Sequence, residues 1–220
     1  MKAMILAAGR GERLRPLTDH TPKPLLPVGG RPLIGHHLAA LAAAGFDEVV
    51  INVAYRGDQI RAALGDGRAQ GLPIRYSVEQ PGALDTGGGV RNALAMLGEA
   101  PFALISADVF TDFDYARLVG VAGEGAHVVL VDNPAHHVDG DFGLDAHGRL
   151  VDAPPRRTYA GIGVYAPALF RAVEAQRFPL VRVIRQALAA GTASGQYHAG
   201  RWIDVGRPSA LVAAREAAGD

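Results

Sequence analysis

Short apolar runs alternate with helix-like stretches through the first half of the chain. Four runs are mostly apolar, as is typical of strands buried on both faces, and lie at 2–7, 48–54, 73–78 and 102–106. Three stretches between them have the spacing of helices and lie at 33–44, 58–64 and 86–97. Strands that alternate with helices predict βαβ units, with a parallel sheet covered by helices on both faces.

The pattern changes in the second half. The run at 126–131 predicts another strand, whereas 140–151 and 159–165 predict strands of a partly antiparallel region. Alanine-rich helical patterns in this half lie at 180–190 and 209–218. The sequence contains no internal repeat and no long linker rich in Gly, Ser or Pro. We therefore predict one α/β domain over 1–220, with a Rossmann-like, mixed and mostly parallel sheet flanked by helices.

Composition narrows the classes of function. The 220 residues include 22 basic and 22 acidic side chains, so no overall field attracts nucleic acid or an acidic membrane surface. No cysteine is present, which excludes disulfides, thiolate metal sites and thiol catalysis. The N-terminus lacks the apolar core of a signal peptide, and no stretch approaches the ~20 apolar residues of a membrane helix. We expect a cytoplasmic protein that has neither nucleic acid nor membrane as a partner.

A glycine-rich loop follows the first predicted strand. Backbone N–H groups converge in such loops, which makes them common phosphate sites. Gly9 and Gly11 fit the start of a dinucleotide fingerprint, but Leu14 stands where its third glycine belongs. Pro16 then interrupts the helix that this motif requires. The nucleotide P-loop fails as well, because its Gly-Lys-Ser/Thr sequence does not follow Gly9. The loop therefore predicts an anion site of another kind.

Lys23 is one of only two lysines, the other being Lys2. The prolines on either side of Lys23 fix the backbone around it, which lowers the entropy cost of holding its ammonium in one place. Because arginine fills every other basic position, a compact point charge here indicates contact with phosphate. For Arg10 and Arg15 in the same loop, we favour the simpler interpretation of solvated surface side chains.

The run LAAGRGERLRPLT at 6–18, followed by PKPL at 22–25, resembles the signature of the sugar-1-phosphate nucleotidyltransferases. The resemblance implies a nucleotide-diphospho-sugar transferase fold, with the nucleotide bound by about 1–115 and the sugar by about 116–220. It also implies that Arg13 holds the triphosphate and that Lys23 holds phosphate oxygens at the reacting centre, both as catalytic residues. The nucleotide-binding residues that it implies in this region are Leu6, Ala7, Ala8, Gly9, Gly11, Arg13 and Lys23.

A transfer of this kind needs a divalent cation, and two aspartates are the candidate ligands. Asp108 follows the run at 102–106 and resembles the family's Gly-Asp motif, with Ala107 in place of glycine. Asp204, in the sequence WIDVG, resembles the family's late W-x-D-x-G motif. The resemblance implies that both are catalytic and hold Mg²⁺, and that Asp108 also binds the nucleotide. The alternatives are a turn or cap residue for Asp108 and a structural ion pair for Asp204, and the histidines lack the spacing of a zinc site.

The stretch 79–89 occupies the place where the family reads the base. Its glycines let a backbone approach a flat ring, and Thr86 is a candidate helix cap. Asp85 stands where many relatives carry glycine. A simple strand-to-helix turn is the alternative interpretation. With the residue at the end of the second predicted strand included, the further nucleotide-binding residues that we expect are Asn52, Glu79, Thr86 and Gly87.

The stretches at 132–137 and 140–143 are similar to the short uridylyltransferases of this family that act on N-acetylmuramic acid 1-phosphate. Larger relatives grip the sugar phosphate with a lysine in a Glu-Lys-Pro motif, and the equivalent region 151–157 contains none. Either Arg156 or Arg157 replaces that lysine, or the sugar phosphate relies on Lys23 and Mg²⁺. The sugar-binding residues that the resemblance implies are Asp141, Gly143, Gly161 and Asp204.

The expected reaction transfers a uridylyl group from UTP to N-acetylmuramic acid 1-phosphate and releases pyrophosphate, in the recycling of peptidoglycan sugars. The substrates are small molecules, and the enzyme is a monomer or a small homo-oligomer. Alternatives within the family are a mannose-1-phosphate guanylyltransferase and a glucose-1-phosphate uridylyl- or thymidylyltransferase. An inactive nucleotide-sugar sensor is the alternative from another class, and retention of the lysine, the arginine and both aspartates argues against it.

Overall fold

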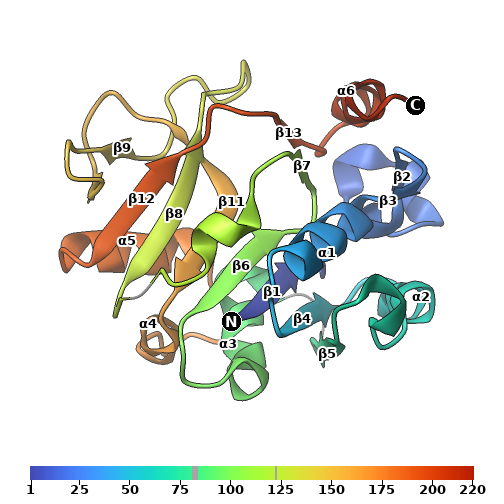
Figure 1. Ribbon diagram of the computed structural model, residues 1–220, viewed down its shortest axis with the longest axis horizontal. Coiled ribbons are helices and arrows are strands. Elements are labelled where there is room, and N and C mark those ends of the chain that lie inside the picture. The colour runs from blue at the N-terminus through green and yellow to red at the C-terminus, as the bar shows by residue number, and fades with distance from the viewer. Residues whose placement is uncertain (81–83, 122) are drawn as a thin grey trace.

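Seven strands form the central sheet of the computed structural model, which describes residues 1–80, 84–121 and 123–220 (Figure 1). Positions 81–83 of the predicted base-reading stretch lie outside the described residues. The strands lie in the order β12-β8-β11-β6-β1-β4-β5. Their bounds are β1 Lys2–Leu6, β4 Glu48–Val53, β5 Ile74–Val78, β6 Phe102–Ser106, β8 Ala126–Val131, β11 Thr158–Tyr165 and β12 Ala193–Tyr197.

The pairing of these strands is mostly parallel. β6, β1, β4 and β5 pair in parallel, as the alternation of strands and helices predicts. β11 reverses the order, because it lies antiparallel to both β6 and β8. At the far edge, β12 pairs in parallel with β8. The predicted mixed, mostly parallel sheet flanked by helices is therefore confirmed.

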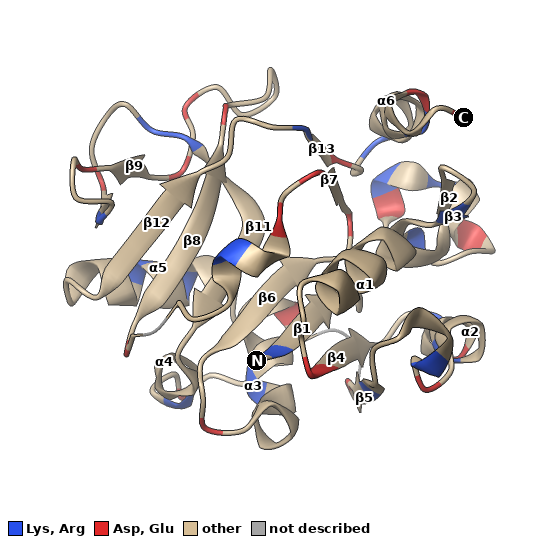
Figure 2. Cartoon of the chain, viewed as in Figure 1, with Lys and Arg blue, Asp and Glu red and all other residues tan. Residues whose placement is uncertain are grey.

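Apolar side chains of the strands alternate between two layers that helices cover. Ala3 and Ile5 of β1 pack with α1 and α2 on one face, and Met4 packs with α3, α4 and α5 on the other. Charged residues gather on the helices and loops around the sheet rather than in its middle (Figure 2). The helices are α1 Leu33–Ala43, α2 Gly57–Leu64, α3 Asp85–Leu97, α4 Pro167–Arg171, α5 Leu180–Ala189 and α6 Pro208–Ala218.

Two features of the second half differ from the sequence-based expectation. The stretch 140–151 is not one strand, because it contains β9 (Gly143–Leu144) and β10 (Leu150–Val151), which pair antiparallel with each other. β12 lies outside the predicted strands, since its sequence ASGQY has no apolar run. Gly195 in β12 lies so close to β8 that an added Cβ would be 2.8 Å from the Val128 carbonyl oxygen, which explains a glycine in mid-strand.

Short elements at the carboxyl edge of the sheet bring distant segments together. β7 (Val109–Thr111) pairs antiparallel with β13 (Trp202–Asp204), so Asp204 lies opposite Val109. Beside them, α6 packs in one apolar cluster with Leu14 of the glycine-rich loop. β2 (Pro27–Val28) and β3 (Arg31–Pro32) form a small hairpin that contacts α6 (Figure 1). The loop after β1, the segment after β6 and the end of the chain thus share one edge.

None of the helices in the described parts of the chain is long and apolar enough to cross a bilayer.

Candidate active site

Lys23 and Asp108 form an ion pair at the carboxyl edge of the sheet. Lys23 Nζ lies 2.6 Å from Asp108 Oδ2. Because β1 and β6 are parallel neighbours, the loops that follow them emerge side by side. Lys23 begins the short 3-10 helix Lys23–Leu25, and Pro22 before it is extended. The lysine side chain is 14% exposed and the aspartate 32%, so the pair is partly screened from water but open to a ligand.

Asp204 joins this pair from β13. The backbone N–H of Val205 donates to the Asp108 carbonyl oxygen at 2.8 Å, which fixes the two aspartates on adjacent chain segments. Burial raises the pKa of Asp204 above its usual value, and the nearby Asp108 carboxylate raises it further. The charges of Lys23, Arg13 and His136 oppose this rise. Two carboxylates that repel each other in this way form a site suited to a cation.

The donor set fits a magnesium ion. Mg²⁺ is usually bound by one or two carboxylates together with substrate phosphates and water, and seldom by a full cage of protein ligands. Asp108 and Asp204 supply the two carboxylates, and their mutual repulsion is relieved by a divalent cation. Within the described residues there is no group of three or more His, Cys, Asp or Glu side chains that can hold a metal.

The glycine-rich loop is locked beside Lys23. Gly11 has a φ of +64°, and an added Cβ there would lie 2.9 Å from Thr18 Cγ2 and 3.3 Å from Lys23 Cβ. The Thr18 hydroxyl donates to the Gly11 carbonyl oxygen at 2.9 Å, which closes the loop. By contrast, an added Cβ at Gly9 would meet no atom within 4 Å, so the space beside it is open. The loop therefore combines one glycine needed for the turn with one that leaves room for a ligand.

Arg13 extends toward the segment that contains Asp204 and Gly206. A Cβ added to Gly206 would lie 2.8 Å from Arg13 Nη2 and 3.2 Å from Asp204 Oδ2, so the guanidinium and this carboxylate both border the glycine. Gly206 therefore leaves the space that Arg13 needs beside Asp204. From the sequence alone, no role is assigned to this glycine. Its place as the last residue of the W-x-D-x-G motif is the sequence signal that points to it.

Asn52 and Glu79 form the buried floor of the site. The backbone N–H of Ala7 donates to Asn52 Oδ1 at 2.8 Å, and Asn52 Nδ2 donates to Glu79 Oε1 at 2.6 Å. The second oxygen of Glu79 accepts the backbone N–H of Leu84 at 2.7 Å. Both side chains are almost completely buried. Their hydrogen bonds tie together the ends of β1, β4 and β5, so they shape the site from below.

Thr86 and Gly87, at the start of α3, pack against the segment before α5. The Thr86 hydroxyl accepts the backbone N–H of Leu180 at 2.7 Å and so satisfies an amide at the start of α5, whereas α3 itself has no side-chain cap. A Cβ on Gly87 would collide with the ring of Phe178. Asp85, where many relatives have glycine, has a φ of +65°, the left-handed region that favours glycine.

Two cavities meet at this edge, and Ser106 and Asp108 line both. The first, of about 250 Å³, has Lys23 in its wall and is otherwise lined chiefly by the expected nucleotide-binding residues Leu6, Ala7, Ala8, Gly9, Asn52, Glu79 and Thr86. The second, of about 380 Å³, includes the side chains of Arg13, His136, His137, Tyr159, Trp202 and Asp204 in its lining. The arrangement places a lysine and two carboxylates between two adjoining spaces.

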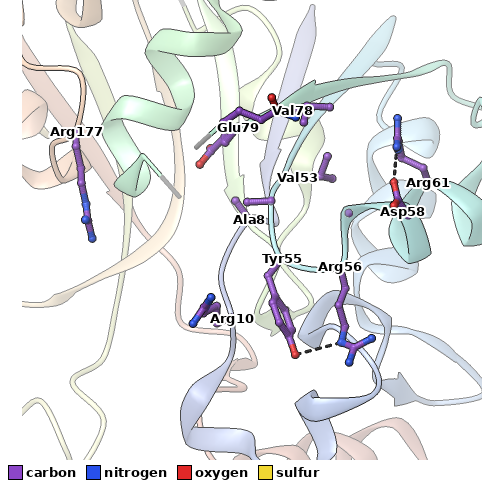
Figure 3. Close-up of a pocket in the computed structure, with 13 residues that line it drawn as sticks. Ala8, Arg10, Val53, Tyr55, Arg56, Asp58, Arg61, Val78, Glu79 and Arg177 are labelled. Carbon is purple, nitrogen blue, oxygen red and sulfur yellow. Dashed lines mark hydrogen bonds and ion pairs between the residues drawn. The ribbon is translucent and has the colours of Figure 1, made fainter. Parts of the chain in front are cut away.

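A third cavity, of about 750 Å³, adjoins the first, because Ala8 and Glu79 line both (Figure 3). Its wall includes Arg10, whose guanidinium lies 5.9 Å from the centroid of the Tyr55 ring. Arg15, the other arginine left undecided by the sequence, pairs with Asp19 at 3.1 Å and lines none of these three cavities.

Of the four expected sugar-binding residues, two line the second cavity and two do not. Asp204 and Gly161 line the second cavity, and Gly161, at φ +73°, lies so close to Ser106 that an added Cβ would be 2.7 Å from its hydroxyl oxygen. Asp141 lies behind this cavity, where Oδ2 accepts the backbone N–H of Tyr159 at 2.8 Å. Gly143 is buried in β9 and does not line the cavity.

Neither arginine proposed to replace the family lysine lines the second cavity. Arg156 pairs with Asp152 at 2.7 Å. Arg157 pairs with Asp132 and stacks on the ring of Tyr197, 3.7 Å from its centroid. The cationic groups available to a sugar phosphate here are therefore Lys23 and Arg13 rather than this pair.

Comparisons with known proteins agree with this geometry. A family model described as Nucleotidyl transferase matches residues 2–220. The chain is 49% identical to N-acetylmuramate alpha-1-phosphate uridylyltransferase of Neisseria meningitidis serogroup B, covering 100% of this chain and 99% of that protein. It is 36% identical to the protein of the same name from Caulobacter vibrioides, covering 96% of this chain and 94% of that one.

A solved structure has the same fold over its full length. It is a putative glucose-1-phosphate thymidylyltransferase from Bacillus anthracis, 26% identical, with a TM-score of 0.87 and coverage of 100% of this chain and 96% of that one. The resemblance inferred from the glycine-rich signature is thereby confirmed, and the chain is an enzyme that belongs to the nucleotidyl transferase family.

Proposed function

We propose that the enzyme transfers a uridylyl group from UTP to N-acetylmuramic acid 1-phosphate and releases pyrophosphate. The observation that carries this proposal is the pair of adjoining cavities that share Asp108, with Lys23 on one side and Asp204 on the other. Two substrates must meet in such a transfer, and one basic and two acidic side chains lie where the cavities join. The names of the two relatives supply the base and the sugar.

The two cavities take different substrates in this proposal. UTP occupies the first cavity, formed mainly by residues at and after the ends of β1 and β6 in the first half of the chain, about 1–115. N-acetylmuramic acid 1-phosphate occupies the second, which β11 and β13 of the second half line. Asn52, Glu79, Thr86 and Gly87 then hold the walls of the nucleotide cavity in shape, since their polar atoms or packing surfaces are engaged within the protein. Asp141 and Gly143 act likewise behind the sugar cavity.

The chemistry follows from charge and position. A phosphate oxygen of the sugar attacks the α-phosphorus of UTP, an O–P bond forms, and the bond to pyrophosphate breaks. The attacking phosphate is already anionic, so no protein base has to remove a proton. The Lys23 ammonium stabilises the charge that develops on the α-phosphate, and Arg13 holds phosphate oxygens from the side of Asp204. Positioning and electrostatics therefore provide the catalysis.

Asp108 and Asp204 would hold Mg²⁺ in this enzyme. Bound there, the ion neutralises triphosphate charge and draws electron density from the α-phosphorus. In its absence the Lys23 ammonium is the counter-ion of Asp108. UTP and sugar 1-phosphates are metabolites of the cytoplasm, and we place the reaction there, in the recycling of peptidoglycan sugars.

The test is a matrix of pyrophosphate-release assays. Each of the four nucleoside triphosphates is paired with a panel of sugar 1-phosphates, once with Mg²⁺ and once with EDTA. The proposal predicts the highest kcat/KM for UTP with N-acetylmuramic acid 1-phosphate, and no release in EDTA. Activity confined to GTP with mannose 1-phosphate would overturn the substrate assignment. No pyrophosphate release with any combination would favour a nucleotide-sugar sensor.

A further inference from the structure

The loop between β8 and β9 lies over the sugar cavity and brings two adjacent histidines to it. His136 and His137 both line this cavity. The loop is held from inside by Asn133, whose Nδ2 donates to the carbonyl oxygens of Val138 at 2.9 Å and Arg156 at 3.0 Å. The Thr158 hydroxyl donates to Asn133 Oδ1 at 2.9 Å. All three hydrogen-bonding groups of this amide side chain are thus used to fix the loop against β11.

His137 is held by an acidic partner. Its Nε2 lies 3.1 Å from Asp141 Oδ1, and the other oxygen of Asp141 accepts the backbone N–H of Tyr159. Asp141 therefore has both oxygens engaged, which leaves it a positioning residue. Because His137 is anchored in this way, the neighbouring residue His136 is presented at a defined place on the cavity wall.

His136 differs from its neighbour in having no such partner. Its side chain makes no hydrogen bond or ion pair to any residue that the structure describes, although it lies near enough to Asp204 for its charge to act on that carboxylate. The side chain is exposed to the cavity and offers ring N–H donors. Such a donor is available to a ligand without breaking a contact in the protein.

The other basic groups near the sugar cavity have either a partner in the protein or a role at the phosphates. Arg13 borders Asp204 and Gly206, where the proposed function assigns it to phosphate oxygens, and Lys23 pairs with Asp108. Arg156 and Arg157 pair with aspartates outside the cavity. With Arg13 engaged by phosphate, a second anionic group on the acceptor meets His136 as the remaining basic side chain of this cavity that has no hydrogen bond or ion pair within the described residues.

We propose that His136, presented by the loop 132–142, forms a carboxylate subsite that recognises the acidic substituent of the acceptor sugar. The inference rests on the proposed function: N-acetylmuramic acid is N-acetylglucosamine with a lactyl ether on O3, and this ether ends in a carboxylate. The subsite distinguishes the two sugars by a hydrogen bond to that carboxylate, in addition to the contacts that both sugars share. His137 and Asp141 position the loop and do not touch the substituent.

The experiment compares two acceptors that differ only by the lactyl group. Initial rates are measured with UTP, Mg²⁺ and either N-acetylmuramic acid 1-phosphate or N-acetylglucosamine 1-phosphate, for the wild type, His136→Ala and His147→Ala. His147 is an exposed histidine outside the sugar cavity and provides the matched control. The inhibition constant of N-acetylglucosamine 1-phosphate against the muramic acid substrate gives its affinity independently of turnover.

The inference predicts that His136→Ala lowers the ratio of kcat/KM for the muramic acid over the glucosamine substrate, or the corresponding affinity ratio, by about tenfold or more. The loss should lie in KM rather than kcat, and His147→Ala should keep the wild-type ratio. An unchanged ratio in His136→Ala, with the wild type still using the muramic acid substrate, overturns the subsite and leaves the proposed function standing. A wild type that does not accept N-acetylmuramic acid 1-phosphate overturns both.

Discussion

Lys23 Nζ and Asp108 Oδ2 lie 2.6 Å apart at the line where the two adjoining cavities join. The ammonium occupies one side of a carboxylate that is also a candidate metal ligand. In the proposed function, a metal ion would therefore compete with the lysine for Asp108. The pair explains why this position carries a compact charge rather than the arginine used elsewhere in the chain.

Removing the lysine should strengthen metal binding in the absence of nucleotide. We expect Lys23→Ala to bind Mn²⁺ about fivefold more tightly than the wild type, because an exposed or partly exposed ion pair contributes about 1 kcal/mol. Isothermal titration with the metal alone measures this without turnover. Weaker or unaltered binding in the variant would show that the metal ion and the Lys23 ammonium do not compete for Asp108.

The carboxylate of Asp204 should be needed for both metal binding and turnover. Asp204→Asn keeps the shape of the side chain but removes the charge, and we expect kcat to fall on the order of 10²-fold with weaker Mn²⁺ binding. Asp112→Asn is the control, since Asp112 follows the same small sheet but pairs with His198 at 3.0 Å. Equal losses in the two variants would mean that the effect is structural.

Gly206 should act on activity through Arg13. Alanine at this position puts a Cβ only 2.8 Å from Arg13 Nη2, which is too close for the two atoms, so the guanidinium has to move away from Asp204. We expect Gly206→Ala to lower kcat/KM for UTP about tenfold with little change in Tm, because a flexible side chain gives way and not the backbone. Gly35→Ala in α1 is the comparison. An added Cβ there would have its nearest contact at 3.7 Å, so this variant should raise the free energy of unfolding by up to about 1 kcal/mol. A large drop in the Tm of Gly206→Ala would contradict this account, because it would show that the backbone rather than the Arg13 side chain has given way.

His37 should make the fold sensitive to acid. Burial lowers the pKa of His37 from 6.5 to about 4, and the neighbouring His36 adds to the fall. Between these two pH values the unfolded chain binds more protons at this residue than the folded chain, so stability falls as pH falls. The lowered pKa of His37 contributes about 3 kcal/mol to this loss in the free energy of unfolding, at 1.36 kcal/mol for each unit of pKa.

The matched comparison for this prediction is His37→Asn against His36→Asn. Asparagine can keep an acceptor near the Tyr115 hydroxyl, which lies 2.7 Å from His37 Nδ1. Urea unfolding at a series of pH values from 7 to about 4 should give a flatter profile for His37→Asn. The slope for His36→Asn should change much less, because burial is the larger cause of the lowered pKa of His37. A His37→Asn profile as steep as that of the wild type would assign the acid sensitivity to other groups.

Much of the fold follows from local pattern, because β1, β4 and β6 are apolar runs that can be recognised as buried strands without knowing their partners. β12 was missed for the opposite reason. Its sequence carries glycine, serine and glutamine, and it is a strand because β8 presents a free edge to it. Such a partner cannot be read from the segment itself.

The site shows the same division. Gly11 and Lys23 belong to one continuous signature, and the structure places them in contact range. Thr86 has a role that sequence could not give, since its hydroxyl binds the amide of Leu180, 94 residues away. The ion pair of Arg157 with Asp132 also joins segments distant in sequence, and it engages a residue that the resemblance offered to the sugar phosphate because of its place in the region 151–157.

The central claim is that the Lys23 charge acts on the reacting phosphates, and one measurement tests it most directly. Pyrophosphate release is followed with UTP, N-acetylmuramic acid 1-phosphate and Mg²⁺ for the wild type, Lys23→Ala and Lys2→Ala. Lys2, the other lysine of the chain, pairs with Glu48 at 3.1 Å and lines neither substrate cavity. The account predicts that Lys23→Ala lowers kcat on the order of 10²-fold or more while Lys2→Ala stays near the wild type. Near-normal release by Lys23→Ala would contradict it.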